Sequence, residues 1–409
     1  MSFKETEVGR IPIDWEVDEL SNKVDLVMGQ SPKSEFYNDK GIGMPFMQGR
    51  TTFGEKYHYI NTWCTDIKRV GIKNSVLMSV RAPVGDVNIA TEDICIGRGL
   101  ASLNMKNKNN EFLYYLLKNY SGLLISKESG TVFGSINKAG IEKLVLPFPN
   151  NSEQKAIAKI LSDLDEKIEV NNKINKNLEE MAQAIFKQWF VDFEFPNEEG
   201  KPYKSSGGEM VKSELGMIPK GWKIFKLGDF IKFIKGKKPK KIEEKFFDGC
   251  ELYLTIDVLN RNSEIFANKD KIIEVNDDDI LMVMDGASSG SLYYGLNGIL
   301  GSTLAKISVL NTIDKSFLYY YLKLNESSIK SHLTGSAIPH TDKEFINKLC
   351  LAIPNDEMIL KKADTILNNI RNHTINLNTE CSKIKKVRDT LLPKLMSGEI
   401  RVPLENSEN

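Results

Sequence analysis

The chain has 409 residues, and 55 Lys and Arg are balanced by 55 Asp and Glu, so the formal net charge is zero. This balance excludes a uniformly basic nucleic-acid-binding domain, whose isoelectric point usually exceeds about 9. The hydrophobic content of 41% excludes an acidic disordered chain, and the length predicts two or three domains.

One sequence pattern occurs twice, in the same order, with its two copies about 205 residues apart. The matching segments are Ile11–Trp15 with Ile218–Trp222, Gly29 with Gly236, Leu77–Met78 with Leu281–Met282, Phe112–Tyr115 with Phe317–Tyr320, and Pro149–Asn150 with Pro354–Asn355. Because the order of the matches is kept, we interpret the chain as a tandem duplication. The period is far too long for a solenoid repeat, so each copy should be a domain with an appendage.

The predicted elements follow the same order in both copies. Short β-type runs bounded by Gly, Pro and Asn come first, then a short helix, then a proline and a long helix. In the first copy these are Ser75–Val80, Asn110–Asn119, and a helix from about Ser152, its expected N-cap, to Val191. In the second copy they are Asp279–Met284, Lys315–Leu324 and a helix from about Asp356 to Met396. A segment rich in Pro, Gly and Ser connects the copies over residues 195–210.

Both long helices carry apolar residues at alternating spacings of three and four, which is typical of a coiled-coil seam. The first seam is Ile157, Leu161, Leu164, Ile168, Leu178, Ala182, Ile185 and Trp189, with Asn171 and Asn175 in its middle. The second is Ile359, Ala363, Ile366, Ile370, His373, Leu377, Glu380, Ile384, Val387 and Leu391. A helix of about 40 residues is roughly 60 Å long and needs a partner. We therefore expect the two helices to form an antiparallel coiled coil with a globular domain at each end.

Catalytic motifs are absent from the sequence. We find no P-loop, no HExxH, no GxSxG and no tetrapeptide of the amino-methyltransferase type. The four histidines are scattered, and no His/Cys cluster has zinc-ligand spacing. The sequence therefore predicts a non-catalytic chain that holds no cofactor or metal.

Several polar loop residues are candidates for contacts to DNA. Lysine can neutralise phosphates, and Gln and Arg make bidentate contacts to adenine and guanine. The candidates are Ser31, Lys33, Gln48, Arg50, Arg81 and Arg98 in the first copy, and Lys237, Lys238, Lys240, Lys241, Ser288 and His340 in the second. Two alternatives stay open, namely that the lysine segment is a solubilising loop and that the other residues belong to ordinary polar turns.

The compartment follows from cysteine usage and from the start of the sequence. The five cysteines form no CxxC pair, which indicates buried thiols in a reducing cytosol. The first residues contain no signal-peptide core, and no apolar run reaches the roughly 18 residues of a membrane span. We therefore expect a cytoplasmic protein that has no membrane partner.

Four motifs resemble those of the DNA-specificity subunit of type I restriction–modification systems, and the resemblance covers essentially the whole chain. They are Gly216–Trp222 at the start of a copy, Leu146–Ile157 at the start of a helix, Phe186–Phe193 at its end, and Leu391–Ile400 near the end of the chain. The second copy departs from this pattern, because Asp356-Glu357-Met358 stands where the first has Ser152-Glu153-Gln154.

The resemblance implies an α+β fold. Two mixed α/β target recognition domains stand in tandem repeat, separated and joined by two long antiparallel coiled-coil helices related by a pseudo-twofold axis. The implied parts are recognition domain 1 (1–150), a central helix (151–194), a linker (195–210), recognition domain 2 (211–355), a C-terminal helix (356–401) and a tail (402–409).

The resemblance also implies the function. Each domain reads one half of a bipartite site in double-stranded DNA, and the helices fix the spacer between the halves. The helices also dock two methyltransferase (modification) subunits, which restriction subunits join. S-adenosylmethionine, ATP and Mg²⁺ are expected on those partners, and DNA affinity is expected to be weak for the chain alone.

Two other functions remain as alternatives. One is a coiled-coil scaffold with two protein-binding domains, which would show no salt-dependent affinity for DNA. The other is a divergent piece of a nuclease–methyltransferase, which the absence of catalytic motifs disfavours.

Overall fold

The computed structural model of the chain describes residues 2–81, 83–126, 134–261, 263–269, 272–310, 313–335 and 337–403. Ala82, next to the candidate DNA contact Arg81, and the part of the predicted tail beyond Pro403 lie outside these residues. The chain divides into two compact units: unit 1 is Met1–Asn172 with Asn378–Asn409, and unit 2 is Lys173–Leu377. Each unit therefore contains a sheet-rich region and a stretch of both long helices. No described helix is long and apolar enough to cross a membrane.

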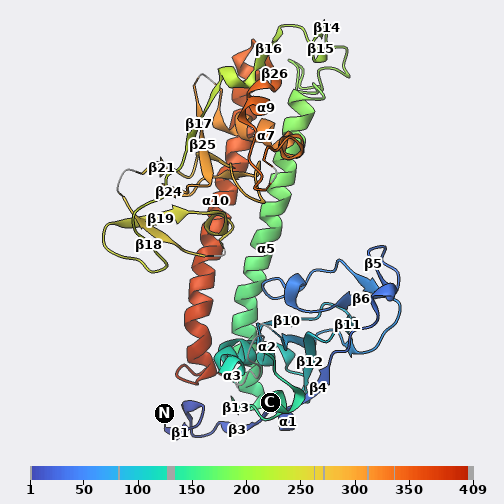
Figure 1. Cartoon of the computed structure of the whole chain (residues 1–409), viewed down its shortest axis with the longest axis vertical. Helices are drawn as coiled ribbons and strands as arrows, with labels where there is room; N and C mark the ends of the chain where they lie inside the picture. Colours follow the sequence, from blue (N-terminus) through green and yellow to red (C-terminus); the bar gives the residue numbers. More distant parts are fainter. Residues whose placement is uncertain are drawn as a thin grey trace. The chain divides into compact units, whose positions relative to one another are not determined.

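Unit 1 contains a four-stranded antiparallel sheet and a five-stranded mixed sheet (Figure 1). The first has the order β10-β9-β12-β4 and the second β5-β7-β6-β11-β8, in which β6 and β11 are parallel. Separate pairs are β1 with β2, and β3 with β13. The strands are β1 (Phe3–Thr6), β2 (Gly9–Pro12), β3 (Glu16–Glu19), β4 (Val24–Met28), β5 (Tyr37–Asn38), β6 (Met44–Met47), β7 (Trp63–Cys64), β8 (Val70–Gly71), β9 (Val76–Ser79), β10 (Val87–Ile89), β11 (Ile94–Ile96), β12 (Leu100–Met105) and β13 (Val145–Phe148).

Unit 2 repeats this topology strand for strand. Its four-stranded sheet has the order β17-β25-β22-β23, and its five-stranded sheet has the order β18-β20-β19-β24-β21. Separate pairs are β14 with β15, and β16 with β26. The strands are β14 (Met210–Ser213), β15 (Gly216–Pro219), β16 (Trp222–Lys226), β17 (Ile231–Lys235), β18 (Ile242–Glu243), β19 (Cys250–Leu254), β20 (Phe266–Asn268), β21 (Glu274–Val275), β22 (Ile280–Val283), β23 (Leu292–Tyr294), β24 (Gly298–Leu300), β25 (Leu304–Val309) and β26 (Cys350–Pro354).

The helices also correspond between the two copies. The α-helices are α1 (Leu20–Lys23), α2 (Asn110–Asn119), α3 (Ser121–Ser126), α4 (Lys138–Glu142), α5 (Asn151–Phe190), α6 (Ile256–Leu259), α7 (Lys315–Leu324), α8 (Glu326–Ser331), α9 (Lys343–Lys348) and α10 (Glu357–Met396). Short 3-10 turns are η1 (Ser34–Phe36), η2 (Arg50–Thr52) and η3 (Leu227–Asp229). The predicted fold of two tandem α/β domains with two long helices is confirmed.

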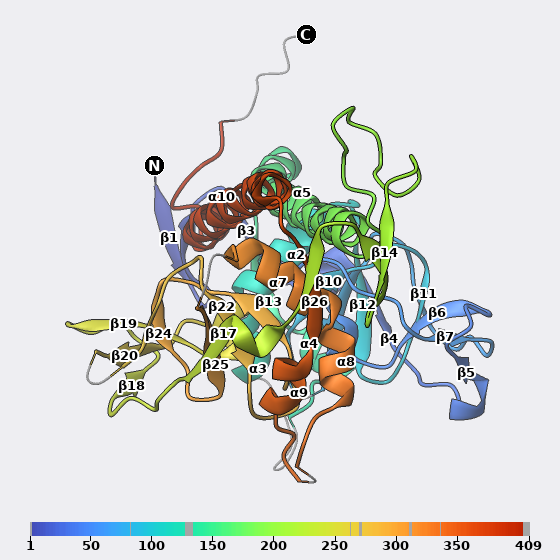
Figure 2. The same cartoon turned by 90° about the horizontal axis from the view of Figure 1, so that it is seen from above.

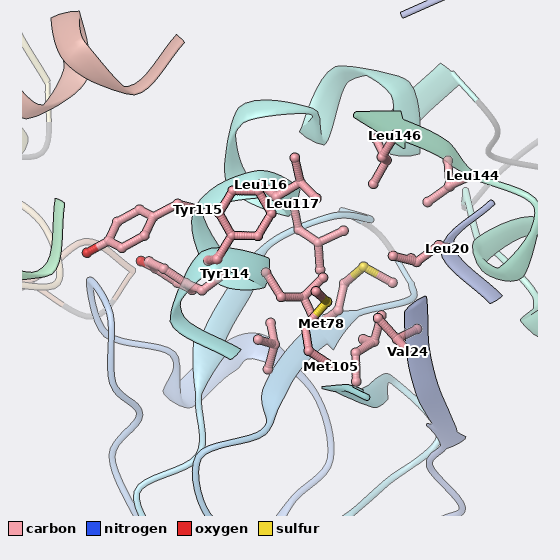
Figure 3. Packing of buried hydrophobic residues seen from close by; sticks show 14 of the residues in the cluster. Leu20, Val24, Met78, Met105, Tyr114, Tyr115, Leu116, Leu117, Leu144 and Leu146 are labelled. Atoms are coloured by element: carbon pink, nitrogen blue, oxygen red, sulfur yellow. The ribbon is translucent and has the colours of Figure 1, made fainter. Parts of the chain in front are cut away.

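The core of unit 1 forms around α2 (Figure 3). All six residues from Phe112 to Leu117 are buried. A helix that is apolar around its whole circumference must be covered on every side. Leu20, Val24, Met78 and Met105 cover it from the sheet side, and Ile157 and Leu161 of α5 belong to the same cluster. In unit 2, α7 occupies the equivalent place between α10 and strands β17, β22 and β25 (Figure 2).

The N-terminus of α5 corrects one prediction. The expected N-cap was Ser152, but the Asn150 side chain accepts the backbone N–H of Glu153 at 3.0 Å. An N-cap side chain bonds to the N–H two or three positions further on, which makes Asn150 the cap. Asn and Ser are both good caps, so residue type alone does not distinguish them.

The predicted seams are correct for α5 and partly wrong for α10. Ile157, Leu161, Ile168 and Ala182 are buried as expected. On α10, however, His373 and Val387 are exposed, whereas Cys381, Arg388 and Leu392 are buried. The reason is that α10 packs against a sheet-rich domain as well as against α5, so its buried stripe is wider than a heptad seam.

Asn171 and Glu380, the polar residues of the two seams in unit 1, contact each other. Asn171 is fully buried, and its Nδ2 donates to Glu380 Oε2 at 2.7 Å. Cys381 Sγ lies 3.9 Å from the carbonyl oxygen of Ile168, so the two helix segments run antiparallel in this unit. The buried Asn171 fixes the register of the two segments, because a slip would leave its amide without this partner. The Glu380 side chain is 44% exposed and also lies 3.5 Å from Lys167.

A buried ionic network joins the helix segments of unit 1 to the domain. The side chains of Arg388 on α10 and Asp165 on α5 are each 6% exposed, and they pair at 2.6 Å. Tyr115 of α2 donates its hydroxyl to Asp165 at 2.5 Å, and Glu55 accepts from Arg388 at 2.9 Å. Removing one member would leave a buried charge without compensation.

The two units use different chemistry at the end of a long helix. In unit 1, Arg401 pairs with Asp14 at 2.8 Å and with the buried Glu153 at 2.5 Å, and Glu153 also accepts from Trp15 at 3.1 Å. In unit 2, Phe195 stacks on Tyr203 at 4.6 Å and on Trp222 at 5.3 Å between ring centroids. The segment after α5 is thus held mainly by aromatic packing, with one ion pair between Asp192 and Lys187 at 2.7 Å.

We predict that Arg388→Met lowers the free energy of unfolding by about 3–5 kcal/mol, because it leaves the Asp165 carboxylate buried and unpaired. Urea denaturation of the full chain measures this loss. The matched control is Lys159→Met, which removes the exposed Lys159–Asp163 pair of α5 and should leave the midpoint almost unchanged. An equal shift for both variants would contradict the role of the network.

Asp364 of α10 makes stability depend on pH. Partial burial and, secondarily, the charge of Asp314 raise the pKa of Asp364 to about 7, and its Oδ1 is buried with no hydrogen-bond partner among the described residues. The folded chain holds the proton of Asp364 more tightly than the unfolded chain does. The folded state is therefore most stable below the unfolded pKa, near 3.8, and loses stability as the pH rises to the folded pKa of about 7.

Asp364→Asn should therefore raise the melting temperature little at pH 4.5 and most at pH 8. At pH 8 the substitution should increase the free energy of unfolding by an amount on the order of 1–2 kcal/mol, after allowance for solvent screening. Melting curves of both proteins at the two pH values give the comparison, with pH 4.5 as the internal control. A gain of the same size at both values would show that Asp364 is not protonated in the folded chain.

Candidate nucleic-acid interface

Four of the predicted residues of unit 1 lie where strands end, and we call this group the unit 1 corner (Ser31, Gln48, Arg81 and Arg98). Gln48 directly follows β6, and Ser31 donates its hydroxyl to Gln48 Oε1 at 2.9 Å. The backbone N–H of Arg98, in the turn between β11 and β12, donates to Ser31 Oγ at 3.0 Å. Arg81 follows Val80, whose backbone N–H donates to the carbonyl oxygen of Gly99 at 2.9 Å. This bond places Arg81 beside the turn that contains Arg98.

Gly97 makes this close approach possible. A Cβ at position 97 would lie 2.6 Å from Gln48 Oε1 and 2.9 Å from its Cα, closer than real Cβ contacts allow. The equivalent Gly301 of unit 2 would meet the carbonyl oxygen of Leu254 at 2.0 Å. Both turns therefore need glycine to place their neighbours at the strand ends.

Two other candidates of unit 1 lie elsewhere. Arg50 of η2 is in an ion pair with Asp86, on a groove of about 340 Å³ that Tyr114 and Lys118 also line. Lys33 is exposed and lies 3.8 Å from Glu35. The charge of Arg50 is thus already compensated within the protein.

In unit 2, Asp285 stands at the repeat position of Arg81 and contacts two further residues, and we call this group the unit 2 corner (Lys235, Asp285 and His340). Arg81 forms an antiparallel bridge with Ser135, and Asp285 forms the same bridge with His340. Asp285 also pairs with Lys235 at 2.8 Å and with His340 Nδ1 at 2.8 Å. Partial burial alone would raise the pKa of Asp285, but the hydrogen bonds from Lys235 and His340 outweigh it, so this pKa is lowered. A carboxylate acceptor therefore stands where unit 1 has a guanidinium donor.

The predicted lysines of unit 2 lie in the exposed loop after β17. Lys237 and Lys238 are exposed and make no ion pair among the described residues. Lys241 lies 4.1 Å from the ring centroid of Phe247 and 4.0 Å from Glu243, and Lys240 is also exposed. Ser288 lies in the turn after β22, next to the buried Ser289, which donates to the carbonyls of Gly286 and Pro339.

Lys235 and Asp285 were not among the predicted DNA contacts. The repeat does identify Asp285, because it occupies the position of Arg81. It gives no signal for Lys235, which matches Met28. Their pairing with His340 could not be predicted, because it depends on a bridge between distant segments.

Known proteins share both the repeat and the fold. The family described as "Type I restriction modification DNA specificity domain" matches residues 12–180 and again 219–386. The MjaIX specificity subunit of a type I restriction enzyme from Methanocaldococcus jannaschii is 29% identical over 98% of this chain and 96% of its own length. A putative MjaX specificity subunit of the same organism is 42% identical over 45% of this chain and 44% of its own length.

A solved structure has the same fold at low sequence identity. It is the S subunit of a type I restriction-modification system from M. genitalium, with a TM-score of 0.61 and 21% identity, and the comparison covers 94% of this chain and 96% of that one. The two matched domains span most of the chain and coincide with its two sequence copies, and so the chain belongs to the type I restriction–modification DNA-specificity family.

Proposed function

We propose that this chain is the DNA-specificity subunit of a type I restriction–modification complex and that each unit reads one half of a bipartite target. One observation carries the proposal: the two corners share a backbone bridge but present different side chains, Arg81 in one and Asp285 in the other. Arginine donates to guanine, whereas a carboxylate accepts from the N4 amine of cytosine. Two equivalent sites with opposite hydrogen-bonding character suit two different half-sites. A scaffold for protein partners would need no such difference, and the family assignment favours DNA.

We place catalysis and cofactors on partner subunits. Two methyltransferase subunits would dock on the long helices and supply S-adenosylmethionine chemistry, and restriction subunits would supply ATP- and Mg²⁺-dependent cleavage in the cytoplasm. The family assignment supports this placement.

Lys237 and Lys238 should contribute phosphate contacts in the assembled complex. Replacing both with alanine should lower the slope of log affinity against log salt by about 2, because each lost phosphate contact removes about 0.9. Titrations of a target duplex at several salt concentrations measure this slope. Lys212→Ala with Lys223→Ala is the matched control, since both are exposed lysines of unit 2 outside the loop. An unchanged slope in the Lys237/Lys238 variant would favour the solubilising loop.

The long helices should set the spacer between half-sites. One heptad inserted after Asn171 in α5, with a matching heptad before Glu380 in α10, keeps the seam in phase. It adds about 10.5 Å, or about three base pairs at 3.4 Å each. Mapping of methylated adenines in cells that express the complex should then find the same half-sites with a longer spacer. An unchanged spacer, or altered half-sites, would contradict this role of the helices.

A further inference from the structure

Gln48 is exposed to solvent, yet the protein holds it at three points. Its backbone carbonyl accepts the N–H of Gly99 at 3.1 Å, and its side-chain oxygen accepts from Ser31 at 2.9 Å. Gly97 lies directly behind it, because a Cβ there would collide with Gln48 Cα. An exposed glutamine ordinarily samples many rotamers and loses that freedom on binding. Here much of the ordering is already complete in the folded chain, as preorganised recognition requires.

The hydrogen bonds also fix which way the carboxamide faces. The hydroxyl oxygen of Ser31 accepts the backbone N–H of Arg98 at 3.0 Å, so the hydroxyl proton remains for Gln48. Only the oxygen of a carboxamide accepts, and only its nitrogen donates. In this arrangement the oxygen of Gln48 faces Ser31, which donates to it, and the NH₂ group is left as the donor to an incoming ligand.

We infer that Ser31 is a positioning residue and that Gln48 selects a base edge that offers a hydrogen-bond acceptor. This inference rests on the proposed reading of one half-site by unit 1. In the major groove adenine, guanine and thymine each present an acceptor, whereas cytosine presents only its N4 donor. Gln48 thus rejects cytosine at one position of one half-site.

Unit 2 lacks this arrangement. The residue after β19, in the place that Gln48 takes after β6, is Thr255, whose hydroxyl caps α6 by accepting the N–H of Val258 at 3.3 Å. The effect of Ser31 and Gln48 should therefore be confined to the half-site that unit 1 reads.

The test uses the full chain assembled with its methyltransferase subunits and a library of duplexes with randomised target positions, sequenced after selection for binding. Ser31→Ala frees the carboxamide to turn over, so discrimination against cytosine should fall about fivefold at one position, the low end of one good base contact. Ser31→Thr keeps the hydroxyl and should restore the original preference. Gln48→Glu replaces the donor with an acceptor and should move the preference to cytosine. Ser34→Ala, in the same loop, is the matched control.

The outcomes separate the possibilities. If Ser31→Ala and Gln48→Glu bind DNA with the wild-type motif, the inference is overturned. It is also overturned if Ser31→Ala and Ser31→Thr change the motif alike, or if both half-sites change, since either result points to a structural role. Melting curves identify any loss of folding, and Gln48→Glu is a second variant at an exposed position. A wild-type complex without sequence preference would overturn the proposed function itself.

Discussion

The ion pair between Arg388 and Asp165 is the interaction on which the architecture of unit 1 depends. It joins a residue near the end of the chain to one in its first half, and Tyr115 extends it into the sheet-rich domain. Apolar packing alone does not fix how a 40-residue amphipathic helix is rotated about its own axis. One apolar residue can take the place of its neighbour in the core at a small cost in free energy. The buried Arg388 removes that freedom, because it contacts Asp165 of α5 and Glu55 of the sheet-rich domain, and a rotation of α10 would separate it from both. The pair therefore fixes how α10 is rotated against α5 and the sheet-rich domain of unit 1.

The two corners follow from the same duplication but have diverged where a ligand would be read. Their shared parts are backbone: the strand ends, the bridge to the segment before α4 or α9, and a glycine at 97 or 301. Their different parts are side chains on that frame. Backbone hydrogen bonds are indifferent to residue type, so the frame can persist while the presented donors and acceptors change. Recognition can diverge in this way without any cost to the fold.

The duplication and the helical periodicity were enough to predict the fold, and they also placed Asn171 and Glu380 on facing seams. The errors arose where tertiary packing decides between similar residues. His373 and Val387 fit a heptad but are exposed, because the surface that buries α10 includes a domain that the heptad pattern ignores. Single residues of the candidate site could be predicted, but not the contacts between them. These contacts are the hydrogen bonds among Ser31, Gln48 and Arg98 and the pairing of Asp285 with Lys235 and His340. Both depend on turns that sequence spacing does not bring together.

The zero net charge acquires a physical meaning from these contacts. Lys235 pairs with Asp285, so charge at the unit 2 corner is compensated inside the protein, and Arg50, away from the unit 1 corner, is compensated by Asp86. Fixed, neutralised groups attract phosphate weakly but offer defined donors and acceptors to bases, while the exposed Lys237 and Lys238 are suited to the opposite task. In the proposed function, attraction to phosphate and selection between bases would therefore rest on different residues. Such a subunit could change its target through corner side chains and keep its general attraction to DNA.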